Sequence, residues 1–181
     1  MRRNSPPPPL DSDALDRLAL RYVERYATTR AKLRDYLVRK VRERGWAGEG
    51  SADPAAVAQR MADLRYVDDL AFAEARVRAL GRRGLGARRI DLALRVAGIA
   101  PTDAAGLRDD IDAQADASAL AFARRRRLGP FASAPADDPR ARAKAFAAML
   151  RAGHDPDRIR RILALDGDEV PHFDPDDTPG P

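Results

Sequence analysis

The chain of 181 residues contains no cysteine. This absence excludes disulfide bonds, thiolate metal sites and a thiol nucleophile, and it is typical of proteins in a reducing compartment. The sequence also lacks any run of roughly 18 consecutive apolar residues, the length that a membrane-spanning helix needs. We therefore expect a soluble, cytoplasmic protein with no membrane association.

Histidine is almost as scarce, since His154 and His172 are the two in the chain. No histidine or carboxylate cluster has the spacing of metal ligands on one helical face, and no serine has a histidine partner that helical periodicity would bring near it. We therefore expect no catalytic residues, no metal and no cofactor, and we predict that the protein is not an enzyme.

Positive charge is unevenly distributed along the chain. There are 33 basic residues, 30 of them arginine, against 28 acidic ones, which gives a net charge of +5. Residues 166–181 hold six acidic residues and no lysine or arginine, so residues 10–165 carry a net charge of +9. Codon usage accounts for the excess of arginine itself. The positions of the arginines are therefore what can indicate an anionic partner.

Apolar residues recur with the period of an α-helix through most of the chain. No segment alternates with a period of two for long enough to predict a strand. The sequence therefore predicts an all-α protein. Nine helices are expected from their apolar stripes, near residues 15–26, 33–45, 53–64, 70–80, 90–98, 101–111, 113–128, 138–153 and 155–163. Three of them are expected to start at an aspartate followed by proline, at 53–54, 138–139 and 155–156. The stripes include Tyr22, Tyr26, Leu64 and Leu70.

The expected helices repeat in groups of three. The middle helices align on the glycines that end them, Gly45, Gly98 and Gly153, at intervals of 53 and 55 residues. Because three short helices bury little surface alone, we expect neighbouring units to stack into an elongated, curved helical array. The predicted domains are a disordered proline-rich segment at 1–13, three tandem three-helix repeats at 14–66, 67–111 and 112–165, and a disordered acidic tail at 166–181.

The stretch GRRGLGARRI at residues 81–90 combines three glycines with four arginines. It has no strand before it and no Lys-Ser or Lys-Thr after it, so a phosphate-binding loop is disfavoured. Gly81 and Gly84 are expected to end one helix, and Gly86 to let the chain turn into the next. Cations at a helix start oppose the helix dipole and need another partner, unless the turn is merely solvated. The predicted contact residues here are Arg82, Arg83, Arg88 and Arg89.

The seventh expected helix ends in a run of four arginines. The helix dipole already favours cations there, so this run ranks second as a contact surface. Its members are Arg124, Arg125, Arg126 and Arg127. Asp68 and Asp69 precede another helix, and their simplest interpretation is an N-cap followed by an acidic residue in the first turn.

Two motifs lie in the middle of the chain, YVDD at 66–69 followed by Phe72, and GLGARRI at 84–90 followed by a helix that ends in Gly-Ile. At this separation they resemble the bacterial RecX family, whose members regulate the RecA recombinase. The resemblance covers roughly residues 14–165 and implies the same layout of three tandem three-helix units. The residues that match the family motifs are Tyr66, Asp68, Asp69, Phe72, Gly84, Gly86, Ile90, Leu94 and Gly98.

The resemblance implies a protein that binds RecA, free or assembled on single-stranded DNA, and lies in the groove of the RecA filament. It would suppress strand exchange, ATP hydrolysis and the coprotease activity that triggers the SOS response. The arginines named above are the expected contacts with acidic patches on RecA or with the DNA inside the filament. We expect a monomer that needs no cofactor.

One alternative is a basic protein that binds nucleic acid directly, without RecA. The body offers Gln59 and Gln114 but no asparagine for reading bases, and its aromatic residues mostly fall on or beside apolar stripes rather than on an exposed stacking platform. Weak DNA binding is compatible with both interpretations. A third interpretation is a helical scaffold whose positive charge only keeps it soluble. The acidic tail is a solubilising end or a competitor of DNA for the basic surface.

Overall fold

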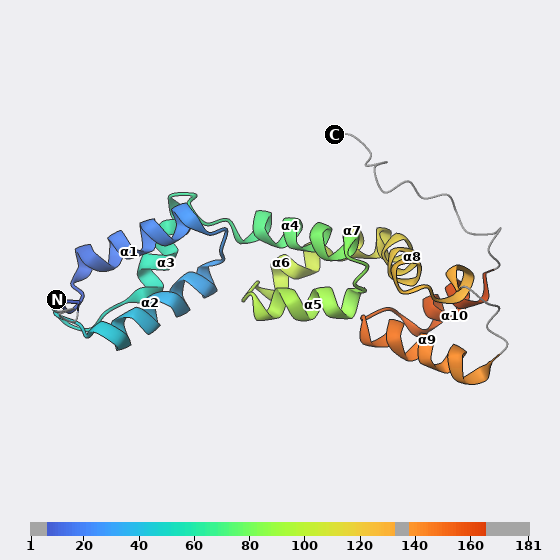
Figure 1. Ribbon diagram of the computed structural model, residues 1–181. Helices are drawn as coiled ribbons and strands as arrows, with labels where there is room; N and C mark the ends of the chain where they lie inside the picture. Colours follow the sequence, from blue (N-terminus) through green and yellow to red (C-terminus); the bar gives the residue numbers. More distant parts are fainter. Residues whose placement is uncertain (1–6, 133–137, 166–181) are drawn as a thin grey trace, which may run out of the picture. The chain divides into compact units, whose positions relative to one another are not determined.

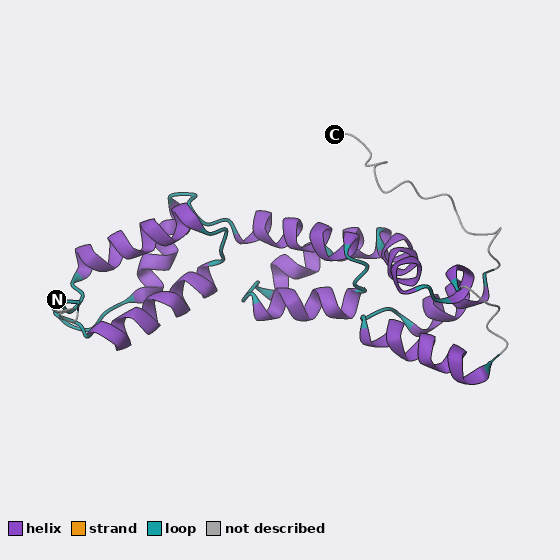
Figure 2. Cartoon of the chain, viewed as in Figure 1, coloured by secondary structure: helices purple, strands orange, loops and turns teal. Residues whose placement is uncertain are grey.

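The computed structural model describes residues 7–132 and 138–165. Within these residues every regular element is a helix (Figures 1 and 2), which confirms the predicted all-α fold. The helices are α1 Ser12–Arg25, α2 Arg30–Arg44, α3 Pro54–Asp63, α4 Asp69–Arg82, α5 Ala87–Val96, α6 Pro101–Gly106, α7 Arg108–Ala113, α8 Ala115–Arg126, the 3₁₀ helix η1 Gly129–Phe131, α9 Pro139–Arg151 and α10 Pro156–Ala164.

Several helices begin where the sequence predicts. At α3, α9 and α10 an aspartate side chain accepts a backbone N–H of the first turn, and a proline occupies the first helical position. This combination satisfies a donor that the helix cannot satisfy itself and uses a residue that has no N–H to lose. The three capping residues are Asp53, Asp138 and Asp155.

Contacts divide the chain into two compact units. Unit 1 comprises Met1–Glu74 and Leu94–Asp103, and unit 2 comprises Ala75–Ala93 and Ala104–Pro181. The divisions fall inside α4 and α5, so each of these helices contributes residues to both units. The three predicted repeats were defined by the spacing of glycines in the sequence, and the two units are defined by contacts. The boundaries of the repeats therefore stay a prediction.

The main core of unit 1 is formed by the apolar faces of α1, α2 and α3. Its buried residues include Leu15, Leu33, Leu37 and Val57. Leu10, which precedes α1, is fully buried in the same core. Its backbone N–H donates to the Gly45 carbonyl at 2.9 Å, and its carbonyl accepts from the N–H of Ala47 at 2.8 Å. Residues 7–11 are therefore held in place, which differs from the disorder expected for residues 1–13; residues 1–6 and 166–181 lie outside the described part.

Several residues assigned to apolar stripes are exposed instead, among them three large ones. Tyr26, Leu64 and Leu70 are 50%, 62% and 49% exposed. Tyr26 and Leu64 are the C-caps of α1 and α3, where the backbone leaves the helix and no longer keeps the side chain on the stripe. Leu70 follows the buried Asp69, and successive helical residues point in different directions. These assignments to the core were wrong.

The helix boundaries between residues 81 and 113 also differ from expectation. Gly81 lies inside α4 and does not end it, whereas Gly84 has a φ of 73° in the turn that follows. The helix expected at 101–111 is two helices, α6 and α7, separated at the buried Leu107. Gly106 precedes this break, and glycine is a poor residue for continuing a helix.

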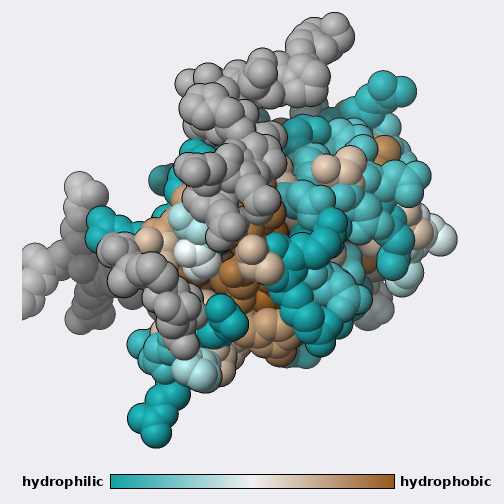
Figure 3. Space-filling view, turned by 90° about the vertical axis from the view of Figure 1, so that its right-hand side faces the viewer, coloured by the Kyte–Doolittle hydropathy of each residue, from teal (hydrophilic) through white to brown (hydrophobic). Residues whose placement is uncertain are grey.

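A hydrophobic core in unit 2 joins α8, α9 and α10 through Ala119, Ala123, Met149 and Ile159. Figure 3 views the molecule from the side on which α10 lies in Figure 1, and an apolar patch there is bordered by hydrophilic residues. Because alanines contribute two of these buried positions on α8, this helix can approach its neighbours closely.

The three glycines that define the sequence repeat all have a positive φ. Gly45, Gly98 and Gly153 have φ values of 83°, 74° and 94°. Glycine adopts positive φ without the steric cost that a side chain adds, and helices commonly end in this way. The turns at Gly98 and Gly153 also share their hydrogen bonds, because each glycine N–H donates to the carbonyl three residues earlier. The turn at Gly45 differs, since its N–H donates to the Val41 carbonyl four residues earlier and its ψ is 168°.

Candidate partner-binding surface

The Gly84-Leu85-Gly86 segment is bound on several sides within unit 2. The Ser118 hydroxyl of α8 donates to the Leu85 carbonyl at 2.8 Å. The backbone N–H of Gly86 donates to the Ala152 carbonyl at 2.9 Å, and that of Arg88 donates to the Gly153 carbonyl at 3.2 Å. The segment thus connects α8 to the turn between α9 and α10.

Both glycines of this segment are required by close approach to other backbone. A Cβ at Gly84 would lie 2.8 Å from the backbone nitrogen of Phe122, and a Cβ at Gly86 would lie 2.4 Å from the carbonyl carbon of Gly153. The N–H groups of Gly86 and Arg88 are already engaged by carbonyls and are not aimed at an anion. The segment is a packed connection, which agrees with the prediction that it is not a phosphate-binding loop.

His154 completes this connection. Its side chain is 2% exposed, its Nε2 lies 3.1 Å from the Gly84 carbonyl, and its ring is tilted against Phe122 at a centroid distance of 5.7 Å. The carbonyl accepts a hydrogen bond when Nε2 carries the proton. Burial lowers the pKa of His154 and Arg158 lowers it further, although the Gly84 carbonyl opposes both effects. Nothing in the sequence indicated that His154 is buried.

The two arginine runs of the sequence meet at the ends of α4 and α8. The Arg125 guanidinium donates to the Arg83 carbonyl at 2.8 Å and to the Arg82 carbonyl at 3.3 Å. Arg125 therefore satisfies carbonyls at the C-terminal end of α4 and brings residues more than 40 positions apart into contact. We name this surface the basic corner and define it by Arg82, Arg83, Arg124, Arg125, Arg126 and Arg127.

Every arginine of the basic corner is exposed. Arg124 lies over the ring of Phe131, with its Cζ 5.3 Å from the ring centroid. Arg127 is the C-cap of α8 and has a φ of 53°, so the chain turns sharply at the end of the run. The basic corner therefore concentrates positive charge at two helix ends, where the dipoles stabilise it.

Arg88 and Arg89 stand apart from these contacts, in the first turn of α5. Arg88 lines a cavity of about 250 Å³ together with Asp112, Asp155 and Arg158. Arg89 instead packs against Gly153 with its backbone and side chain. A Cβ added to Gly153 would lie 2.6 Å from the backbone nitrogen of Arg89. The two arginines are exposed, but the cavity beside Arg88 mixes both signs of charge.

The two acidic residues of the YVDD motif have different roles. Asp68 accepts from the N–H of Ala71 at 2.9 Å and so caps α4, as predicted. Asp69 lies in the first turn of α4 but turns inward to α2. It accepts from the backbone N–H of Arg30 at 2.9 Å and from its Nε at 3.0 Å. The sequence did not predict this contact, because the two residues lie 39 positions apart on different helices.

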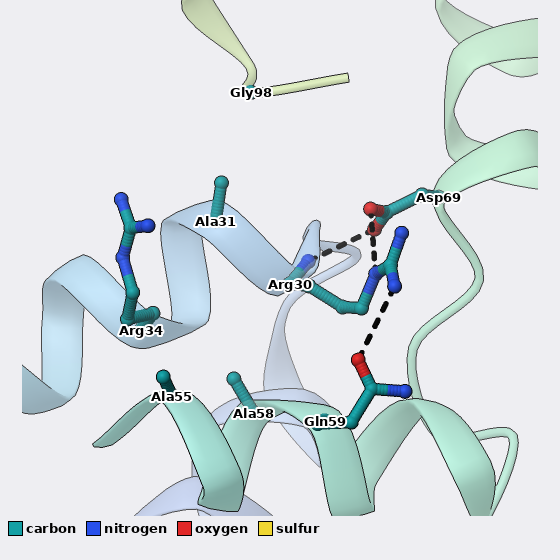
Figure 4. A pocket seen from close by; sticks show the side chains of 8 residues that line it. All are labelled: Arg30, Ala31, Arg34, Ala55, Ala58, Gln59, Asp69 and Gly98. Carbon is teal, nitrogen blue, oxygen red and sulfur yellow. Dashed lines mark hydrogen bonds and ion pairs between the residues drawn. The ribbon is translucent and has the colours of Figure 1, made fainter. Parts of the chain in front are cut away.

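Figure 4 shows this contact at the edge of a cavity of about 230 Å³ in unit 1. The Arg30 side chain reaches between Asp69 of α4 and Gln59 of α3, while Arg34 stands one turn away on α2. Arg30 is thus oriented by a carboxylate and an amide oxygen. The cavity is lined by the same α2 surface on which Gly98 packs.

The remaining motif residues are mostly structural. Ile90 and Leu94 are buried at 3% and 0%, and Phe72 accepts the Lys32 ammonium over its ring at 5.0 Å. Gly98 could carry no side chain, because a Cβ there would lie 2.2 Å from the Cβ of Ala31. Tyr66 is an exception, since its side chain is 55% exposed.

Comparison with known proteins places these features in a family. A family model described as RecX, second three-helix domain, matches residues 68–105. The regulatory protein RecX of Agrobacterium fabrum is 31% identical over 157 residues, which cover 84% of this chain and 83% of the relative. The chain belongs to the RecX family. The regulatory protein RecX of Myxococcus xanthus is 30% identical over 146 residues, covering 77% of this chain and 78% of the relative.

A solved structure has the same fold. The crystal structure of RecX from Lactobacillus salivarius matches with a TM-score of 0.63 at 22% identity, covering 83% of this chain and 93% of that one. The resemblance drawn from the YVDD and GLGARRI motifs is therefore confirmed. RecX relatives are named as regulatory proteins, and this chain shares that regulatory family.

Within residues 7–132 and 138–165, none of the helices has the length and apolar character needed to pass through a bilayer. The same residues contain no group of three or more histidine, aspartate or glutamate side chains placed to hold a metal ion.

Proposed function

We propose that this RecX-family chain binds RecA, both free and assembled on single-stranded DNA, and inhibits its recombinase, ATPase and coprotease activities. It would thereby act in DNA repair and the SOS response, as a cytoplasmic monomer that works by binding rather than by catalysis. The family membership supports the choice of partner. The observation that carries the proposal further is the basic corner.

The basic corner provides a surface of one charge sign on a fixed frame. Arg125 is held by two carbonyls of the neighbouring helix end, which fixes the relation between its run and the Arg82-Arg83 pair. Positive surfaces of this kind accelerate and orient association with acidic protein surfaces or with phosphates. We propose the corner as the principal contact with the filament, and Arg88 and Arg89 as further contacts.

The test is the ATPase rate of RecA on single-stranded DNA as the protein is titrated in, beside a DNA-binding assay at the same salt concentration. Inhibition is expected at concentrations well below those that coat the DNA. The combined variant Arg82→Glu and Arg126→Glu should weaken inhibition by about tenfold or more, because it reverses two charges of the corner while Arg125 keeps its hydrogen bonds.

A matched control is the combined variant Arg95→Glu and Arg151→Glu. These arginines are also exposed in the last turns of helices, α5 and α9, so the change in charge and in dipole interaction is the same. The control should inhibit nearly as well as the unchanged chain. Equal losses in both variants would remove the basic corner as the contact. Inhibition only at DNA saturation would identify a DNA-binding protein that acts without RecA.

A further inference from the structure

Three tyrosines form a row in unit 1: Tyr22 on α1, Tyr26 at its C-cap and Tyr36 on α2. The rings of Tyr22 and Tyr36 are stacked at a centroid distance of 4.2 Å with an interplanar angle of 24°. The ring of Tyr26 is tilted against that of Tyr22, at a centroid distance of 5.2 Å and an interplanar angle of 49°. Tyr22 and Tyr36 also pack against the core, whereas the outermost ring, Tyr26, is half exposed. The row therefore begins at the core and ends in an accessible aromatic ring.

Cations accompany both ends of the tyrosine row. The Cζ of Arg25 lies 5.7 Å from the Tyr26 centroid. At the other end, the Cζ of Arg39 and the Nζ of Lys40 lie 5.6 Å and 5.9 Å from the Tyr36 centroid. These distances fit cation–π contacts, which hold the cations beside the rings.

The surrounding charge remains positive after local pairing. Glu43 pairs with Lys40 at 2.6 Å and with Arg39 at 3.7 Å, and the hydrogen bond from Lys40 is the largest cause that lowers the Glu43 pKa. This carboxylate is therefore charged and offsets part of the positive charge near Tyr36. The whole of α2 nevertheless carries seven basic and two acidic residues.

An accessible ring at the end of an aromatic row, bordered by cations, fits a ligand that has both flat unpaired rings and phosphates. Duplex DNA keeps its bases stacked inside, and an acidic peptide would use the cations but not the exposed ring. Single-stranded DNA uses both, because its bases stack on aromatic side chains while its backbone follows basic groups.

We propose that the tyrosine row of unit 1 is a binding site for single-stranded DNA, in which an unpaired base stacks on Tyr26 and the flanking cations contact the backbone phosphates. Sequence periodicity assigned Tyr22 and Tyr26 to one apolar stripe, and α2 brings Tyr36 to them only in the folded chain. The site shares no residue with the basic corner, and its binding of DNA does not require RecA.

The experiment measures binding of the full chain, without RecA, to two end-labelled oligonucleotides by fluorescence anisotropy. One is a thymidine 15-mer, and the other is an abasic deoxyribose-phosphate chain of the same length and charge. The thymidine oligonucleotide should bind at least about fivefold more tightly, as expected for one base–aromatic stack. Tyr26→Ala should abolish this difference and leave binding of the abasic chain unchanged. Tyr26→Phe should retain it.

Tyr66→Ala is the matched control, because Tyr66 lies in the same unit and is exposed to a similar degree, 55% against 50%. It should preserve the preference for bases, and circular dichroism should show unchanged helix content in all three variants. Equal affinity for the two oligonucleotides would overturn the proposal, as would an equal loss in the two alanine variants. Tighter binding of a uridine RNA 15-mer would overturn the assignment to DNA. Normal RecA inhibition by Tyr26→Ala would show that the two proposals stand independently.

Discussion

The start of α2 in unit 1 contacts the turn at Gly98, and the start of α5 in unit 2 contacts the turn at Gly153. Each turn follows a later helix of the chain, but the two junctions are made by different groups. At α2, the Thr29 hydroxyl donates to the Ala97 carbonyl at 2.6 Å, and Gly98 packs on the Cβ of Ala31. At α5, the backbone of Gly86 contacts the turn at Gly153 directly. The first junction is made by side chains and the second by backbone.

Because of this difference, substitutions at the two junctions are expected to have unequal effects. Thr29 also caps α2, because its hydroxyl accepts from the N–H of Lys32 at 3.2 Å, so one side chain serves both the helix and the junction. A side chain can be exchanged for another that leaves more room. Backbone atoms cannot be removed, so the junction at Gly86 offers no equivalent adjustment.

The largest expected effect is that of Gly86→Ala. Its new Cβ would lie 2.4 Å from the carbonyl carbon and oxygen of Gly153, so the turn must move and break the Gly86 hydrogen bond to Ala152. We expect the free energy of unfolding to fall by about 3 kcal/mol or more, measured by urea denaturation. Gly106→Ala, whose Cβ meets nothing within 4 Å, should change it by less than about 1 kcal/mol. Similar values for the two variants would refute the close backbone packing.

Gly98→Ala is expected to lower the free energy of unfolding by a smaller amount, and a second substitution should restore part of it. Its Cβ would lie 2.2 Å from the Cβ of Ala31, and its φ of 74° adds strain. Replacing Ala31 by glycine removes the clashing atom, so the double variant should recover about 1–2 kcal/mol relative to the sum of the single changes. A double-mutant cycle in urea measures this coupling. A coupling energy of zero would show that the junction at α2 is not limited by these two atoms.

The smallest expected effect is a pH dependence confined to the junction at α5. The pKa of His154 is lowered from its ordinary value of 6.5 in the folded chain, chiefly by burial, so the unfolded chain takes up its proton first as pH falls. The contribution of neutral His154 is complete above pH 6.5 and is lost progressively as pH drops below that value. Urea denaturation between pH 7.5 and pH 5 should show this decline.

His154→Phe is the control for this prediction, since it keeps an aromatic ring beside Phe122 but carries no titrating group. The variant loses the hydrogen bond to Gly84 at every pH, and the part of the decline that is due to His154 should disappear. An unchanged slope in the variant would assign the pH dependence to other groups.

The sequence predicted most of the fold because helices carry local signals. Aspartate followed by proline located the starts of α3, α9 and α10, and the repeating glycines located three turns of positive φ. Stripe assignments failed at Tyr26, Leu64 and Leu70, where helix ends or a neighbouring buried residue redirect the side chain. Periodicity describes residues inside a helix and says little about its ends.

The candidate site was only partly predictable. Both arginine runs were identified from their local density, but their meeting at Arg125 depends on how α8 lies against the end of α4. The same limit applies to the tyrosine row, because Tyr36 belongs to a different helix from Tyr22 and Tyr26. Neither convergence leaves a signal in the spacing of residues.

The helical class, the positions of the main caps and turns, and the family follow from the amino-acid sequence, because each depends on short-range patterns or on motifs at a fixed separation. Only the tertiary structure decided which charges converge at the basic corner, which rings stack in unit 1, and why Gly86 faces Gly153. These features arise from contacts between residues 14 to 70 positions apart, and such contacts are set by helix packing rather than by local conformational preference.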